Sequence, residues 1–80
     1  MSSPDKLVAM ANQIGKFFTP QGHDKAVAGI ANHLTKFWPP SMRKKIVHHL
    51  DEGGEGLDPL VSEAVELLRA TLPNEAEYSG

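Results

Sequence analysis

Apolar residues recur at helical spacing along most of this chain, and this pattern predicts its secondary structure. In a first stretch they fall within an arc of about 120° when plotted at 100° per residue. These residues are Leu7, Met10, Ala11, Ile14, Phe17 and Phe18. A second stretch, from about residue 23 to residue 38, places Val27, Ile30, Ala31, Leu34, Phe37 and Trp38 on one face. Because the alternating pattern of a strand occurs nowhere, we expect an all-α protein.

Prolines and glycines mark where these helices begin and end. Ser3 followed by Pro4 is typical of a helix start, and residues 19–22 end that first helix. Pro40 can open a third helix that runs to about Leu50. We therefore predict three to four short helices in a single domain.

The third predicted helix is followed by a glycine-rich loop and a last apolar stretch. Residues 51–56 form the loop, and Asp58 before Pro59 caps a fourth helix that extends to about Leu72. We assign residues 1–73 to the helical domain. We expect residues 74–80 to form a disordered tail.

The first two predicted helices also resemble each other in sequence. Residues 10–18 align with residues 30–38 at an offset of twenty positions, with four identities in nine. Two copies are too few for a solenoid, which needs three or more repeats. We therefore interpret the two helices as a pseudo-repeated helical hairpin.

Charge is distributed unevenly between the two ends of the chain. The net charge of −2 combines a net +5 in residues 1–50 with a net −7 in residues 51–80. In one interpretation, acidic and basic helices pack side by side and partly neutralise each other. In a second, the two poles face different surfaces of a larger partner. A third, nucleic-acid binding, assigns the basic half to phosphates.

The residue types offer little for catalysis. Eighty residues without cysteine allow neither disulfides nor thiolate metal sites, and none of the four histidines has another at i+3 or i+4. The acidic residues in and beside the loop after the third helix would repel phosphate. An EF-hand calcium loop that began at Asp51 would need glutamate at its twelfth position, where this chain has Ser62. Glu63 and Glu66 fall on an outer helix face, where we expect ordinary pKa values. We predict no active site, and neither a signal peptide nor a membrane span in a cytoplasmic protein.

The aromatic residues are the best candidates for contact with a partner, because four of the five form two doublets. Phe18 and Trp38 lie at the centre of the apolar arcs, which favours core packing, whereas Phe17 and Phe37 lie at the edges. His33 lies opposite its apolar arc, so it is either solvent-exposed or a polar contact to a partner.

The basic stretch at residues 43–45 admits three interpretations: a solvated face, a patch for an acidic partner, or a DNA contact. The full set of candidate contact residues is Phe17, His33, Phe37, Trp38, Met42 and Arg43.

Several of these segments resemble the delta subunit of soluble NAD-dependent formate dehydrogenases. The resemblance covers about residues 6–68. The quoted motifs are residues 6–14 with Phe17 and Phe18, then Ile30, His33, Phe37, Trp38, Pro40, Met42 and Arg43, and finally Gly53, Gly54, Gly56, Leu57, Pro59 and Leu60. The chain departs from the pattern at Pro39, where we expect an acidic residue that would cap the third helix.

The resemblance implies a small accessory subunit without an active site or cofactor of its own. Its partners would be the large subunits of a molybdenum- or tungsten-dependent formate dehydrogenase, which carry molybdopterin, iron–sulfur clusters and FMN and pass electrons to NAD. The chain would support assembly or stability of that complex. Two alternatives remain open: a maturation factor for cofactor insertion, and a small nucleic-acid-binding protein. We expect neither a nucleic-acid nor a membrane partner, and a homodimer of the isolated chain is left open.

Overall fold

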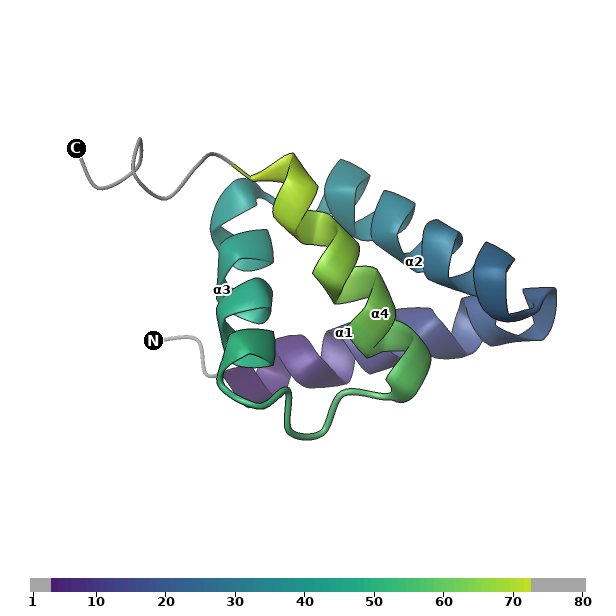
Figure 1. Ribbon diagram of the computed structural model, residues 1–80, viewed down its shortest axis with the longest axis horizontal. Coiled ribbons are helices and arrows are strands. Elements are labelled where there is room, and N and C mark those ends of the chain that lie inside the picture. Colours follow the sequence, from purple (N-terminus) through teal and green to yellow (C-terminus); the bar gives the residue numbers. More distant parts are fainter. Residues whose placement is uncertain (1–3, 73–80) are drawn as a thin grey trace.

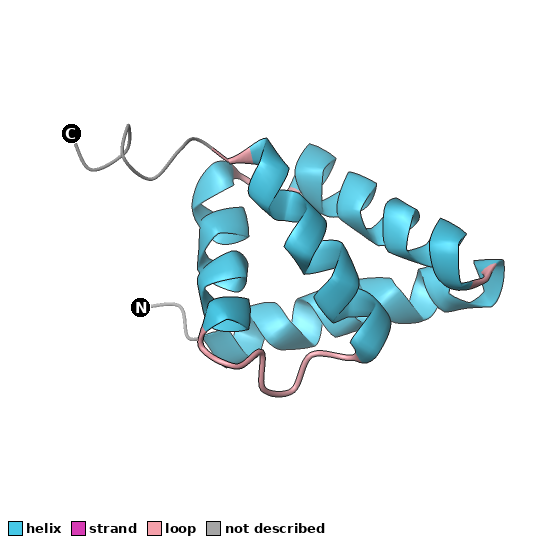
Figure 2. Cartoon of the chain, in the orientation of Figure 1, coloured by secondary structure: helices cyan, strands magenta, loops and turns pink. Residues whose placement is uncertain are grey.

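The computed structural model describes residues 4–72, and these residues fold into four α-helices and two short 3₁₀ helices (Figure 1). The elements in chain order are α1 (Pro4–Phe18), η1 (Thr19–Gln21), α2 (His23–Phe37), α3 (Pro40–Asp51), α4 (Pro59–Leu67) and η2 (Leu68–Thr71). Within the described residues there is no strand (Figure 2). The predicted all-α class is therefore confirmed. The predicted tail and the predicted Ser3 cap lie outside the described residues.

The turn at η1 joins α1 and α2 into a hairpin whose helices diverge from that turn (Figure 1). Helix α3 spans the open end of the hairpin. Helix α4 crosses in front of the hairpin and packs against α1, α2 and α3. The crossing of α1 and α4 is close at Gly15. A Cβ atom on that glycine would lie 2.5 Å from Cγ2 of Val61, which is too short for two carbon atoms.

The core lies where the four helices meet, and it contains no buried polar or charged side chain among the described residues. Its largest fully buried side chains come from α2, α3, α4 and η2; they are Ile30, Leu34, Ile46, Val61, Val65 and Leu68. Trp38, directly after α2, is also buried, as its central place in the apolar arc predicts. The predicted arcs therefore build the core only in part: Leu7, Ala11, Ile30 and Leu34 are buried, whereas Met10, Phe17 and Phe37 are exposed.

The starts of α3 and α4 use proline geometry without side-chain caps. Pro39 and Asp58 occupy the two N-cap positions, and neither side chain makes a capping hydrogen bond. The predicted role of the Asp58 carboxylate as a cap is therefore wrong. The backbone N–H of Asp58 makes a separate contact, with α1.

That contact is a clamp by which Asn12 of α1 holds the loop between α3 and α4. The Asp58 N–H donates to Asn12 Oδ1 at 3.0 Å, while Asn12 Nδ2 donates to the Gly56 carbonyl at 2.8 Å. Gly56 has a φ of +87°, a conformation that favours glycine. His49 adds a second anchor, because its Nε2–H donates to the Glu55 carbonyl at 2.8 Å. The loop therefore has a fixed shape against α1.

Candidate functional site: an aromatic face on the α1–α2 hairpin

Four rings form a continuous chain of contacts from the end of α1 to the end of α2. Phe17 and Phe18 meet edge to face, with ring centroids 5.2 Å apart and planes at 87°. The next contacts, Phe18 with His33 and His33 with Phe37, have centroid separations of 6.3 and 4.7 Å. Such edge and tilted arrangements are the favourable geometries for aromatic pairs. The two predicted edge aromatics therefore belong to one cluster.

The two outer rings of this chain are largely in solvent. Phe17 is 75% exposed and Phe37 is 69% exposed, whereas Phe18 and His33 are half-buried. Ile14, one turn before Phe18, extends the apolar surface along α1. We call Ile14, Phe17, Phe18, His33 and Phe37 the aromatic face.

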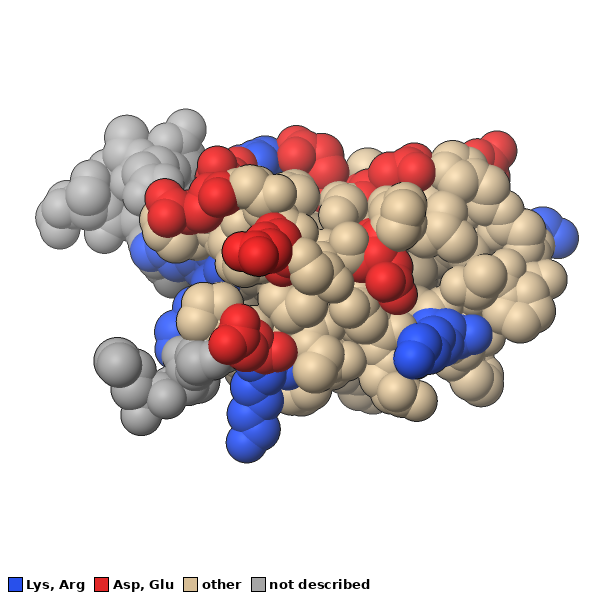
Figure 3. All heavy atoms as spheres, turned by 90° about the horizontal axis from the view of Figure 1, so that it is seen from below, with Lys and Arg blue, Asp and Glu red and all other residues tan. Residues whose placement is uncertain are grey.

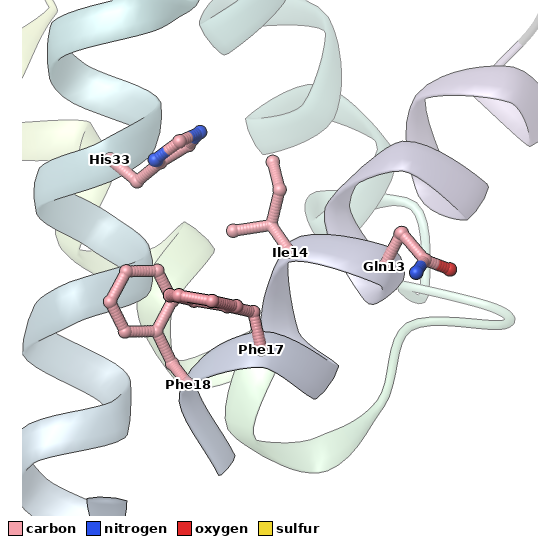
Figure 4. A pocket seen from close by; sticks show the side chains of 5 residues that line it. All are labelled: Gln13, Ile14, Phe17, Phe18 and His33. Atoms are coloured by element: carbon pink, nitrogen blue, oxygen red, sulfur yellow. The ribbon is translucent and has the colours of Figure 1, made fainter.

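An open hollow of about 400 Å³ lies within the aromatic face and is lined by Gln13, Ile14, Phe17, Phe18 and His33 (Figure 4). Ile14 and His33 point into the space between the two helices, and the rings of Phe17 and Phe18 meet below it. Gln13 lies at the outer edge, on the side of α1 away from α2. The hollow is therefore mostly apolar, and Gln13 and His33 are its two polar lining residues.

The position of Phe18 depends on a glycine across the hairpin. A Cβ atom on Gly29 would lie 2.6 and 2.7 Å from two carbons of the Phe18 ring, so the ring rests directly on the α2 backbone. This contact keeps Phe18 at the core margin, half-buried, although its sequence position predicts a central core residue. His33, for which the sequence left solvent exposure or a polar partner contact open, is not fully exposed. Its ring is half-buried between those of Phe18 and Phe37, because the hairpin brings α1 alongside it.

The other three candidate contact residues lie apart from the aromatic face. Trp38 is only 6% exposed and belongs to the core, and Met42 is half-buried against that core. Arg43 fastens three segments together: its Nε donates to the Trp38 carbonyl at 3.1 Å, and its Nη1 donates to Thr71 Oγ1 at 2.7 Å. The structure thus groups Phe17, His33 and Phe37, and it gives Trp38 and Arg43 contacts within the chain. Partner contact by all six stays a prediction.

Two groups of ionic contacts tie α4 and η2 to the other helices. His23 at the start of α2 lies 2.8 Å from Glu63 Oε2 and 2.9 Å from Asp24 Oδ1. The hydrogen bond with Glu63, followed by that with Asp24, raises the pKa of His23 above 6.5. This pair links α2, in the basic half of the chain, to α4, in its acidic half.

The second group centres on Arg69, which binds the carboxylates of Asp51 and Glu66. Its hydrogen bonds hold the pKa values of both carboxyl groups below their ordinary range. The expectation of an ordinary pKa for Glu66 is therefore wrong. The i,i+3 spacing of Glu66 and Arg69 places both side chains on one helical face, and this spacing indicates an ion pair.

Neither a metal cluster nor a membrane span occurs in the described part of the chain. Within residues 4–72, no three His, Asp or Glu side chains are grouped so as to hold a metal ion. No helix there combines the length and the apolar character that crossing a bilayer requires.

Acidic side chains gather in the upper half of the view from below, and most visible basic ones lie in its lower half and at its left edge (Figure 3).

Comparison with known families gives one match. Residues 6–65 match the family of the NADH-dependent formate dehydrogenase delta subunit FdsD. No curated protein and no solved structure matches the chain. The matched segment contains α1, α2, α3 and most of α4, and with them the whole aromatic face and the Asn12 clamp. The chain therefore belongs to the FdsD family of NADH-dependent formate dehydrogenase delta subunits.

Proposed function

We propose that this chain is a non-catalytic accessory subunit of an NAD-dependent formate dehydrogenase. It binds the folded large subunits and supports the assembly or the stability of their complex. The observation that carries this proposal is the family match over residues 6–65. In a protein that binds only the folded form of its partner, binding stabilises the partner by mass action, without any new chemistry.

The surface of the chain supports this role. Large apolar side chains that stay in solvent on a small protein typically mark an interaction site. Phe17 and Phe37 are 75% and 69% exposed, and both belong to one continuous cluster of rings. Aromatic side chains supply much of the binding energy at protein interfaces. Partner contact through these residues fits an accessory subunit better than an isolated enzyme.

In this proposal the chemistry belongs entirely to the partner subunits. They carry molybdopterin, iron–sulfur clusters and FMN, and they transfer the electrons of formate to NAD in the cytoplasm. The accessory chain contributes surface only. We therefore expect its removal to change the amount or the lifetime of active enzyme, and to leave the KM values for formate and NAD unchanged.

The test is coexpression of the large subunits with and without this chain, followed by purification through a tag on a large subunit. Intact-complex mass spectrometry should find the chain at a fixed stoichiometry in active enzyme. Omission of the chain should lower the yield of the complex or shorten its half-life on heating. If active enzyme lacks the chain, and its half-life equals that of enzyme made without it, the accessory role is wrong. That result would favour a maturation factor that leaves after cofactor insertion.

A further inference from the structure

We infer that the aromatic face binds one amphipathic helix of a partner subunit, a helix whose apolar stripe is flanked by aspartate or glutamate. This inference rests on the proposed function for the existence of the partner. It adds the location of the contact on this chain and the chemistry of the partner segment.

The shape of the aromatic face favours a helix as the occupant. The hollow lies between two helices and is open to solvent, with Ile14 and His33 pointing into it (Figure 4). Apolar grooves between helices take amphipathic helices, whose side chains at i, i+3, i+4 and i+7 enter the groove as anchors. Addition of a strand would need an open sheet edge, and residues 4–72 contain no strand. A helix can also contact Phe17 and Phe37 at once, because the ring chain runs from α1 to α2.

One lysine on each helix is a surface neighbour of a residue that lines the hollow. Lys16 follows Gln13 by three positions on α1, and Lys36 follows His33 by three positions on α2. Residues three or four apart are neighbours on a helix surface. Lys6 lies on the same side of α1 as Phe17, since it is separated from it by eleven positions, or about three turns. All three lysines are exposed.

These lysines have no acidic partner within the part of the chain that the structure describes. No ion pair or side-chain hydrogen bond there involves Lys6, Lys16 or Lys36. The only acidic residues on α1 and α2 are Asp5 and Asp24, and Asp24 is bonded to His23 at the start of α2. A complementary partner therefore brings carboxylates beside its apolar side chains. A second copy docked through the same face would set lysines against lysines, which disfavours a symmetric dimer.

The first experiment compares two variants of the full chain for binding to the large subunits, which are purified without it. In the test variant Phe17→Ser is combined with Phe37→Ser. In the control, Leu67→Ser changes an apolar side chain that is also exposed, at 51%, but lies on α4 outside the aromatic face. We expect the double variant to raise Kd by about tenfold or more, as loss of interface anchors does. The control should bind as the wild type does.

The outcomes distinguish a failure of the proposed function from a failure of this inference. Failure of the wild-type chain to bind the large subunits would overturn the proposed function. Wild-type binding that the Phe17→Ser, Phe37→Ser variant retains in full would overturn this inference and leave the proposed function intact. Circular dichroism of each variant confirms that its helices are formed, so loss of binding reports on the surface.

The second experiment tests the acidic flank of the partner helix. Binding should weaken stepwise from wild type to Lys16→Gln with Lys36→Gln, and further to Lys16→Glu with Lys36→Glu. Added salt should reduce wild-type affinity more than that of the glutamine variant. Equal affinity of all three chains would contradict the predicted charge complementarity.

A crosslink identifies the occupant directly. The chain has no cysteine, so Gln13→Cys carries a benzophenone label at one defined point on the edge of the hollow. Irradiation of the assembled complex should join it to a helical segment of a large subunit that has Asp or Glu beside its apolar positions. A crosslink to a second copy of the chain, to nucleic acid, or to a segment without acidic residues would overturn the inference.

Discussion

The Asn12 clamp gives the sharpest test of the fold, because the sequence repeat supplies its own control. Asn12 and Asn32 occupy equivalent positions of the two repeats. Asn12 makes two hydrogen bonds to the loop between α3 and α4, at 2.8 and 3.0 Å. Asn32 is exposed, and its side chain has no hydrogen bond within the described residues. We predict that Asn12→Ala destabilises the domain and that Asn32→Ala does not.

The magnitude follows from the number of bonds. A neutral hydrogen bond contributes about 0.5–1.5 kcal/mol to net stability, so loss of both should cost about 1–3 kcal/mol. Alanine also has a higher helix propensity than asparagine, and both substitutions gain that advantage equally. The difference between the two variants therefore isolates the clamp. A loss of about 1–3 kcal/mol is a large share of the roughly 4–12 kcal/mol expected for a domain of this length.

The assay is urea unfolding followed by circular dichroism, with the two variants and the wild type at the same pH. Thermal unfolding should agree, with a midpoint shift of about 4–8 °C for each kcal/mol lost. Hydrogen exchange at the Asp58 amide gives an independent readout, since that amide loses its acceptor in Asn12→Ala. If the unfolding free energies of the two variants agree within about 0.5 kcal/mol, the clamp contributes nothing and the reasoning from these two bonds is refuted.

Three further predictions concern the contacts between helices. The pKa of His23 is raised in the folded state, mainly by its hydrogen bond with Glu63. The contribution of His23 to the free energy of unfolding is therefore full below pH 6.5 and is lost as the pH rises through the folded-state pKa. In urea unfolding at several pH values, Glu63→Gln should flatten that pH dependence. Gly15→Ala should destabilise the domain by up to about 3 kcal/mol, although alanine has the higher helix propensity, because the new Cβ meets Val61. In a double-mutant cycle, adding Val61→Ala should remove the penalty of that clash. Arg69→Ala should make the free energy of unfolding depend less on pH in the acid range, because the two carboxyl groups that Arg69 binds have lowered pKa values and lose their stabilisation as pH falls through those values. An unchanged acid unfolding curve would contradict this.

The helices could be predicted from sequence because their signals are local. The apolar period of 3.6 residues predicts that these segments are helical, and Pro40 and Pro59 stand where two of the helices start. The observed bounds of α2 and α3, His23–Phe37 and Pro40–Asp51, each lie within one residue of the predicted ends.

The contacts that shape the aromatic face are between helices, and sequence spacing does not contain them. Phe18 packs directly on the α2 backbone because Gly29, eleven residues away, has no side chain to fill that space. His33 contacts rings from both helices, and its place on its own helical wheel does not predict the ring from α1. The partners of Asn12 lie 44 and 46 residues away along the chain. Only the packed structure brings such groups together.

Of the four identities between the repeats, the alanine identity has the same role in both helices and the asparagine identity does not. Ala11 is 0% exposed and Ala31 is 8% exposed, and small side chains at these points let the helices approach the core closely. The two asparagines differ, because only Asn12 lies where the loop before α4 passes. The sequence identity at Asn32 therefore does not stabilise the described fold through hydrogen bonds.

The other two identities, Lys16 with Lys36 and Phe17 with Phe37, place a Lys–Phe pair near the end of each helix, and the fold does not account for these pairs. Neither lysine makes an ion pair in the described part of the chain, and the two rings are the most exposed large apolar side chains there. Solvent-exposed phenylalanine contributes little to folding and lowers solubility. Yet the hairpin places both pairs beside one apolar hollow and connects their rings through Phe18 and His33. A surface that repeats a cation and an aromatic ring on two helices, without internal use for either, is best explained by a partner that supplies the apolar cover and the negative charge.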